Sequence, residues 1–595
     1  MTLFHNYPEP RQGPDAPYKH VDISVPVLRG PSLAIGANII HSFGFLQNIL
    51  WGNVGLLSYR KLTTLDTYSP RFDPTVIPIA SDAVASSTEA LPAPQQTRIS
   101  GFWTSADYRQ RYLSGDLTPT VVVETLLPLI QKDSKSPGRF SIGFLESQAD
   151  VVRAAAAAST RRYSAGESLG PLDGVPVAVK DEVHLKGYKR TLASKIDFSR
   201  DIDATSWCIE KLEEAGAIVI GKTTMHELGI DTTNNNPNTG TPLNPHNPQY
   251  YCGGSSGGSA YSLAAGLVPI AVGADGGGSI RIPSSFCGVY GLKPSHGRIS
   301  AAPTPGLAPT VGVYGPMASS IDDLALAYRL MATPPPATVD PVAAEFASPL
   351  LSLSSPSEEK PKKLGIFRAW IDRAEPAVRA VFDKTLAYLQ TEQGYTVIDI
   401  EIPHLIEGQH AHALTILSEL SAGVSPSDTS KLLPHTKMLI SATHATSTDY
   451  IIAQKLRSLL MSHLAYLFTT HRDLIILTPT TTLPGWKIEG GPKDLAYGVA
   501  DAKKSTRNME YVWLANLTGC PAISCPAGYV DETKMPVGIM GMGEWGSEER
   551  LLVFAKDHQG VVSAELSTPS GKGAVWADVI GEAERKLKGS SASKL

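Results

Sequence analysis

The sequence is poor in cysteine, with only five cysteines among 595 residues, at positions 208, 252, 287, 520 and 525. Their number is odd and their spacing irregular, so they do not form the paired framework of a disulfide-stabilised secreted domain. Cys520 and Cys525 also lack the spacing of a zinc ribbon. We therefore expect a reduced, intracellular protein in which Cys252 and Cys287 are small buried residues rather than nucleophiles.

An excess of charge of one sign is also missing. The 52 Lys and Arg residues nearly balance the 57 Asp and Glu residues, which leaves a net charge of -5 and a pI of about 6.3. Proteins that bind nucleic acids usually carry clustered positive charge. The composition therefore excludes a general nucleic-acid binder.

A secretory signal and a membrane-spanning run are not found either. The start MTLFHNYPEP has neither a charged n-region nor an apolar core, and polar residues such as Asn38 and Gln47 interrupt the uncharged segment from Gly30 to Tyr59. The apolar residues of this segment recur at three- and four-residue steps, which is typical of amphipathic helices. We favour helices that pack on the protein itself, and peripheral contact with a membrane surface is the alternative.

Composition divides the chain into four parts. Residues 1–68 form an N-terminal extension with the amphipathic helices, and residues 69–100, rich in Pro, Ser and Ala, form a linker. Helical and short apolar segments then alternate over residues 101–565, which is typical of an α/β domain with a mixed, largely parallel central sheet covered by helices on both faces. Residues 566–595 form a C-terminal tail.

The last three residues, Ser593, Lys594 and Leu595, match the peroxisomal targeting signal. The preceding run from Lys588 to Ala592 is short and polar, so we expect the terminus to be accessible to a peroxisomal import receptor. A chance match would instead leave the protein cytoplasmic.

Two glycine-rich patterns match motifs that their surroundings do not support. Gly216 to Thr223 reads as a phosphate-binding loop, but its variable positions are a strand-like apolar run that follows a helix. Gly253 to Gly257 matches the G-x-S-x-G elbow, yet a loop and not a strand precedes it. None of the 15 histidines has a spacing that singles it out as a metal ligand, so we predict neither a metal nor a nucleotide cofactor.

Three segments carry residues suited to acyl transfer. GVPVAVKD ends an apolar strand at Lys180, GGSSGGS contains Ser255, and GADGGGSIRIP contains Ser279. Burial favours the neutral amine of a lysine, which can act as a base. Glycine-rich backbone beside a serine leaves amide groups free to stabilise an oxyanion.

These segments, followed by GLKP, resemble the amidase signature family in both order and spacing. Lys180 and Ser255 are 75 residues apart, and Ser279 follows 24 residues after Ser255. The resemblance runs from about Trp103 to about Phe554 and does not cover the N-terminal hundred residues. It implies the amidase signature fold and a mechanism that needs no metal or cofactor.

Carried over to this sequence, the resemblance implies a triad with Ser279 as nucleophile, Ser255 as relay and Lys180 as base, with a cis peptide bond before Ser255. The oxyanion hole would consist of the amides of Gly276, Gly277, Gly278 and Ser279. Structural roles beside the triad fall to Ser256, Asp275 and Arg281. Gly276 replaces the commoner Thr or Ile, which would loosen the oxyanion loop or widen the pocket.

We therefore predict an amidase that hydrolyses a small-molecule carboxylic amide through an acyl-enzyme on Ser279. The loop from Leu228 to Pro237 and a helical lid over residues 404–470 would form part of the substrate funnel. The alternatives are an acyltransferase or esterase with the same triad, a glutamine amidotransferase component that works with a partner protein, and a catalytically silent binding protein. The acyl group of the substrate and the oligomeric state, including a homo-oligomer, stay open.

Overall fold

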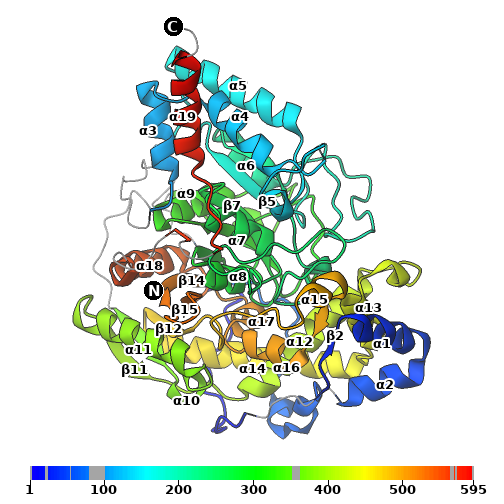
Figure 1. The fold of residues 1–595 in the computed structure, drawn as a ribbon. Helices are drawn as coiled ribbons and strands as arrows, with labels where there is room; N and C mark the ends of the chain where they lie inside the picture. Colours follow the sequence, from blue (N-terminus) through cyan, green and yellow to red (C-terminus); the bar gives the residue numbers. More distant parts are fainter. Residues whose placement is uncertain are drawn as a thin grey trace.

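The centre of the protein is a mixed sheet of eleven strands (Figure 1). The computed structural model describes residues 3–20, 25–53, 55–79, 101–133, 135–350, 362–562, 568–569 and 573–592. Across the sheet the order is β11 (Thr396–Asp399), β10 (Lys363–Ile366), β12 (Leu474–Pro479), β15 (Pro536–Met542), β14 (Ala522–Tyr529), β8 (Tyr290–Lys293), β9 (Val313–Ala318), β7 (Ile270–Asp275), β5 (Pro176–Lys180), β6 (Ile218–Thr223) and β4 (Phe144–Glu146).

The sheet is mixed, as predicted, but it is not largely parallel. Among the described strands four neighbouring pairs are parallel, in the groups β11-β10-β12 and β7-β5-β6. The other six pairs are antiparallel, and five of them lie between these two groups. Alternation of helices and strands records how consecutive elements connect. It does not record the relative direction of neighbours such as β14 and β8, which are distant in the sequence.

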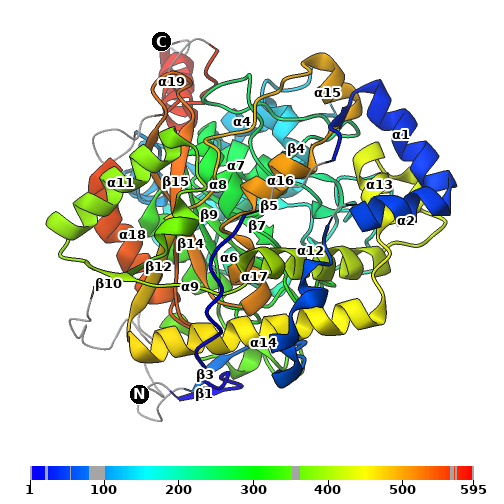
Figure 2. The same ribbon diagram turned by 90° about the horizontal axis from the view of Figure 1, so that it is seen from below.

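Helices cover both faces of the sheet (Figure 2). On one side α6 (Trp207–Glu214), α9 (Ile321–Met331), α18 (Glu548–Val562) and α11 (Pro376–Thr391) pack one against the next. On the other side lie α7 (Gly257–Ala264) and α8 (Arg281–Cys287). The remaining elements of the main body are α3 (Ser105–Ser114), α4 (Pro119–Ile130), α5 (Ala149–Ala165), α10 (Arg368–Ile371), α15 (Pro492–Tyr497), α16 (Ala502–Asn508) and α17 (Trp513–Thr518).

Local signals explain where several helices begin and end. Thr104 and Asp107 form a capping box at the start of α3, which satisfies amide groups that have no partner within the helix. Gly166 ends α5 in the left-handed conformation that favours glycine, with φ 74. The alanine-rich run after Ala149 therefore forms a helix with a defined end.

The lid region predicted at residues 404–470 is helical. It consists of α12 (Leu405–Ala422), α13 (Pro434–Ala442) and α14 (Ser447–Thr470), and a second capping box, of Thr446 and Asp449, starts α14. Buried residues of α12 and α14 form one large apolar cluster, while β5 and β7 contribute to another. The cluster of the lid also contains Ala522 of β14 and Met540 of β15, so the lid shares its core with central strands of the sheet.

The N-terminal extension packs on the lid (Figure 2). Its helices α1 (Pro31–Ser42) and α2 (Gly44–Asn53) contact α13, where Lys437 Nζ donates to Asn38 Oδ1 at 3.0 Å. The short strand β2 (Leu28–Arg29) pairs with β13 (Val499–Ala500). One face of these two helices therefore packs on the protein itself, which is the interpretation that we favoured from the sequence.

The predicted linker is structured at its start. Within residues 69–79, strand β3 (Ile77–Ile79) pairs with β1 (Leu3–His5) in a small separate sheet. Residues 80–100 lie outside the described residues.

The C-terminal tail contains a helix that we did not predict. α19 (Val579–Ala592) packs on α4, and Arg111 Nε of α3 donates to Glu584 at 2.9 Å. The run from Lys588 to Ala592, expected to be unstructured, belongs to this helix because the charged segment before it continues the helical pattern. Ser593 to Leu595 lie outside the described residues.

Within the described residues, no single helix has the length and apolar character needed to cross a bilayer. α1 and the first nine residues of α2 meet that criterion only as a pair, and they are bent by 109° relative to each other.

Candidate active site

Strand β5 carries Lys180 into the interior. All five residues of β5 are buried, and the strand lies between β6 and β7 with parallel pairing on both sides. Lys180, the last residue of β5, is fully buried, and its Nζ donates to Ser255 Oγ at 2.9 Å and to the carbonyl of Ala274 at 3.2 Å. Two of the three predicted triad residues are therefore in direct contact.

Ser255 lies in the glycine-rich loop before α7. The peptide bond between Gly254 and Ser255 is cis, as the sequence resemblance implies. Ser255 is buried, and its carbonyl accepts a hydrogen bond from the amide of His226 at 3.1 Å. The loop thus places the Ser255 hydroxyl within hydrogen-bonding distance of Lys180 Nζ.

Ser279 lies in the loop that connects β7 to α8. Ser279 and Gly276 are half-buried and line the same small cavity as Lys180 and Ser255. Gly278 has φ +103, and a Cβ atom there would come within 2.4 Å of Val512 Cγ2, so this position requires glycine. The structure therefore brings Ser279 to the cavity that the other two predicted residues line.

Asp275 organises this loop. Its carboxylate accepts hydrogen bonds from the amides of Gly278 at 2.6 Å and Ile280 at 3.1 Å, and it pairs with Arg281 Nε at 3.0 Å. Burial opposes ionisation, but the charge and hydrogen bonds of Arg281 hold the pKa of Asp275 well below its ordinary value. Asp275 and Arg281 thus hold together the loop that carries Ser279.

The contacts of Asp275 correct the predicted oxyanion hole. The Gly278 amide is already donated to Asp275, so it is not free for an oxyanion. Among the described residues, no hydrogen bond uses the amides of Gly276, Gly277 or Ser279. Three of the four predicted donors therefore stay available.

Ser256 joins the two serine loops. Its amide donates to the carbonyl of Ser279 at 3.1 Å, and its hydroxyl donates to the carbonyl of Ala274 at 3.1 Å. Ser256 is fully buried.

Two residues of the site were missed by the sequence analysis. Asn516 of α17 donates to Asp275 Oδ1 at 3.0 Å and accepts from Arg281 Nη2 at 2.6 Å. His412 of α12 hydrogen-bonds the carbonyl of Gly276 at 2.7 Å, and burial lowers its pKa to about 4. Neither residue stands in a distinctive motif.

The lid also uses the space that Gly276 leaves. A Cβ atom at Gly276 would come within 3.0 Å of Ile416 Cδ1 from α12. The glycine therefore lets the lid approach the oxyanion loop, and the pocket is not widened at this point.

Two adjoining cavities meet at Ser279. The first, of about 50 Å³, surrounds the side chains of Lys180, Glu182 and Ser255. The second, of about 390 Å³, also reaches Gly277 and Ser279 and is lined mainly by apolar residues. These come from the loop after Leu228, from α12 and α13, and from the N-terminal extension, among them Leu28, Ile40, Leu50, Ile230, Ile416, Leu417, Leu420, Met438 and Leu439. The loop and the lid helices expected to form the substrate funnel thus line this cavity, and the N-terminal extension lines it as well.

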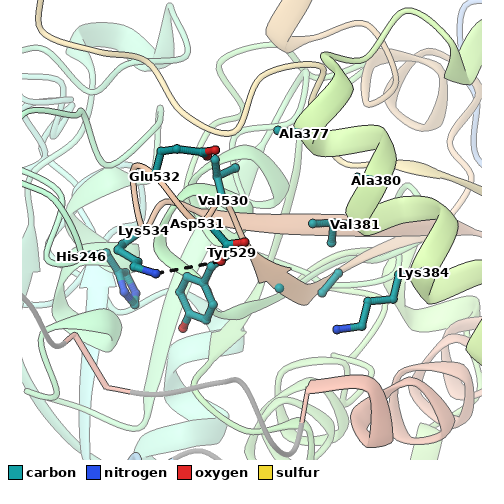
Figure 3. A pocket seen from close by; sticks show the side chains of 12 residues that line it. His246, Ala377, Ala380, Val381, Lys384, Tyr529, Val530, Asp531, Glu532 and Lys534 are labelled. Atoms are coloured by element: carbon teal, nitrogen blue, oxygen red, sulfur yellow. Dashed lines mark ion pairs between the residues drawn. The ribbon is translucent and has the colours of Figure 1, made fainter.

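A further pocket lies away from Ser279. It has a volume of about 640 Å³ and is lined by α11, by the turn between β14 and β15 and by His246, with Lys384 and Glu532 among its residues (Figure 3). Lys180, Ser255 and Ser279 are not among the residues that line it.

The described residues contain one group with the composition of a metal site. His226, Asp231 and His435 have ligand atoms within 4.8 Å of one another. Asp231 also accepts hydrogen bonds from Ser505 at 2.7 Å and from the amide of Thr232 at 2.6 Å. The histidine spacing in the sequence did not indicate this group, because His435 comes from the lid and the other two from the loop after β6.

The misleading glycine motifs have the structure that we expected. Residues Ile218–Thr223, within the segment that matches the phosphate-loop pattern, form strand β6, and helix α6 precedes them.

All five cysteines are free and buried, and burial raises the pKa of the Cys252 thiol.

Comparison with known proteins agrees with this geometry. Residues 141–552 match the Amidase family. A fatty acid amide hydrolase of Medicago truncatula is 35% identical over 76% of this chain and 75% of its own length. A glutamyl-tRNA(Gln) amidotransferase subunit of Deinococcus radiodurans is 30% identical over 79% of this chain and 100% of its own length. The crystal structure of a bacterial aryl acylamidase has the same fold, with a TM-score of 0.65 at 24% identity over 79% of this chain and 100% of that chain. The chain belongs to the amidase signature family of amide-hydrolysing enzymes.

Proposed function

We propose that this enzyme hydrolyses amides of long apolar acyl groups through a covalent acyl-enzyme on Ser279. The apolar cavity of about 390 Å³ that ends at Ser279 carries this proposal, because it offers an acyl chain a dry surface next to the nucleophile. Burying a methylene group contributes about 0.8 kcal/mol. The name of the fatty acid amide hydrolase relatives supports the same substrate class.

In the proposed mechanism the neutral amine of Lys180 takes the proton of Ser255 Oγ while Ser255 takes the proton of Ser279 Oγ. The 2.9 Å contact between Lys180 and Ser255 supports the first of these transfers. Ser279 Oγ then attacks the amide carbonyl, and the proton returns along the relay to the leaving nitrogen. Water attacks the acyl-enzyme in a second step that uses the same base.

The free amides of Gly276, Gly277 and Ser279 would receive the oxyanion. Because Asp275 holds the loop by accepting from Gly278 and Ile280, these donors are oriented before the substrate binds. Preorganised donors in a site without water stabilise developing charge strongly, and loss of one typically costs about 10²–10³ in rate.

Chain length of the acyl group should control the rate. Over a series of amides with the same amine and acyl chains of increasing length, we expect kcat/KM to rise roughly tenfold for every two methylene groups until the cavity is filled. The rate of hydrolysis is measured as the release of the free acid. A rate independent of chain length, or one that favours short polar acyl groups, would contradict the proposal.

A variant that fills the cavity is the matched test. Met438 of α13 lines the cavity, so Met438→Trp should lower kcat/KM for long acyl chains and leave short acyl amides nearly unaffected. The short substrate in the same preparation controls for folding.

We also propose that α1 and α2 contact a membrane surface. Their apolar residues Ile35, Phe45 and Ile49 are 62%, 63% and 55% exposed, while Ile40 and Leu50 of the same helices line the cavity. One pair of helices therefore presents an apolar outer face and forms a wall of the cavity. Such an arrangement suits a substrate that arrives from a bilayer.

Vesicle binding tests this contact. In sedimentation with phosphatidylcholine vesicles, the double variant Ile35→Glu, Phe45→Glu should bind at least about tenfold less than the wild type, because each buried side chain contributes about 1.5–3 kcal/mol. Ile451→Glu is the control, since Ile451 is 42% exposed but lies on α14. Equal binding of all three proteins would argue against the proposed surface.

Peroxisomal import is proposed from the terminal Ser593, Lys594 and Leu595. The full-length chain with a fluorescent protein at its N-terminus should collect in peroxisomes, and deletion of the last three residues should make it diffuse. A diffuse full-length fusion with a free C-terminus would contradict the assignment.

A further inference from the structure

Glu182 contacts the proposed catalytic base. Its Oε2 lies 2.9 Å from Lys180 Nζ, and no other carboxylate among the described residues pairs with this lysine. Glu182 is buried, Lys180 is fully buried, and both line the small cavity with Ser255 and Ser279. Lys180 ends an apolar strand, yet its amine has an acidic partner.

The two protonation states of Lys180 would use its contacts differently. Its Nζ has three partners, Ser255 Oγ at 2.9 Å, the Ala274 carbonyl at 3.2 Å and Glu182 at 2.9 Å. An ammonium group has three N–H donors and fills all three contacts. A neutral amine has two, so its lone pair is left for the hydroxyl of Ser255. A nearby carboxylate favours the first state, whereas the proposed mechanism needs the second.

The neighbouring carboxylates of Asp181 and Asp275 have cationic partners of their own. Asp181 pairs with Lys222 at 2.8 Å, and Asp275 pairs with Arg281 at 3.0 Å. From the remaining elements, Arg190 Nε donates to the backbone carbonyl of Glu182 at 2.7 Å, and burial raises the pKa of Tyr314 on β9. Glu182 is therefore the anion that acts directly on Lys180.

We propose that Glu182 is a positioning residue that keeps Lys180 as an ammonium in the resting enzyme and thereby sets the pH above which the triad works. This inference rests on the proposed function of Lys180 as base. When the ammonium releases one proton to solvent, the amine keeps two N–H groups, which Glu182 and the Ala274 carbonyl accept. The lone pair then faces Ser255. The carboxylate thus both delays activation and orients the active form.

The test compares pH profiles of the wild type, Glu182→Gln and Glu182→Asp. The labelling rate of Ser279 by a fluorophosphonate and kcat/KM for an acyl amide are measured from pH 5 to pH 10. Glutamine keeps the shape but removes the charge, so the midpoint of the acid limb should move to lower pH by about one unit or more. Below both midpoints, Glu182→Gln should therefore keep at least a tenfold larger fraction of its plateau rate than the wild type. The shorter carboxylate of Glu182→Asp should move the midpoint in the same direction by less.

Glu167→Gln removes one negative charge from an exposed position and should leave the midpoint unchanged. A midpoint that is unchanged or higher in Glu182→Gln would overturn the proposal, and if that variant does not fold, an unchanged midpoint in Glu182→Asp would do so. A wild type that is not labelled at any pH would instead refute the nucleophile, so the two failures are distinguishable.

Discussion

Ser279→Ala should lower the rate of amide hydrolysis by about 10⁴-fold or more, because the acyl-enzyme can no longer form. The side chain of Ser279 makes no hydrogen bond among the described residues, so its removal leaves the loop contacts of Asp275 and Ser256 in place. The variant should therefore fold normally. Activity is measured as acid release from an acyl amide, covalent labelling with a fluorophosphonate, and folding by thermal unfolding.

Ser262→Ala provides the matched control for this variant. Ser262 is a buried serine of α7 whose hydroxyl donates to the carbonyl of Ser259 at 2.8 Å, away from the proposed chemistry. It should keep nearly full activity and labelling. Turnover by Ser279→Ala above about one per cent of the wild-type rate, or labelling at another residue, would overturn the assignment of the nucleophile.

Ser255→Ala and Lys180→Met should each lower kcat by about 10³-fold or more, and the double variant should be no slower than the slower single variant. The reason is the proposed shared proton path, in which Lys180, whose Nζ lies 2.9 Å from Ser255 Oγ, acts on Ser279 through Ser255. Methionine fills the volume of the buried lysine without a base. The measurement is a double-mutant cycle on kcat at a pH where the wild type is fully active.

Losses that multiply in the double variant would show that Ser255 and Lys180 act independently. Thermal unfolding of each variant separates this result from damage to the fold. Lys180→Met leaves Glu182 without its ion-pair partner, so a lower melting temperature is expected for that variant. The Ser255→Ala variant retains the ion pair and should melt close to the wild type.

The candidate residues were predictable because each stands in a short segment whose local geometry serves the chemistry. Lys180 ends a buried strand, and Ser255 and Ser279 lie in glycine-rich loops. The fold class followed from the alternation of helices and strands, and the lid from the helical pattern of residues 404–470. These features depend on residues within about a dozen positions of one another, which a sequence displays directly.

The residues that surround the proposed triad come from distant parts of the sequence and were not predictable in this way. Asn516, His412 and Ile416 reach the oxyanion loop from helices more than a hundred residues away. The extension was left without a role, yet Ile40 and Leu50 line the cavity because α1 and α2 dock on α13. Periodicity shows that a helix has an apolar face, but it does not show which partner covers that face.

The sequence by itself thus determined the family, the α/β class and the candidate nucleophile, relay and base, because each of the three residues stands in a short segment whose order along the chain resembles the family. Only the tertiary structure decided the direction of the central strands, the loss of the Gly278 amide to Asp275 and the composition of the cavity. It also decided the environment of Lys180, which has Glu182 at 2.9 Å. The physical reason is that each of these depends on where side chains point and which segments pack together, and packing joins residues irrespective of their separation along the chain.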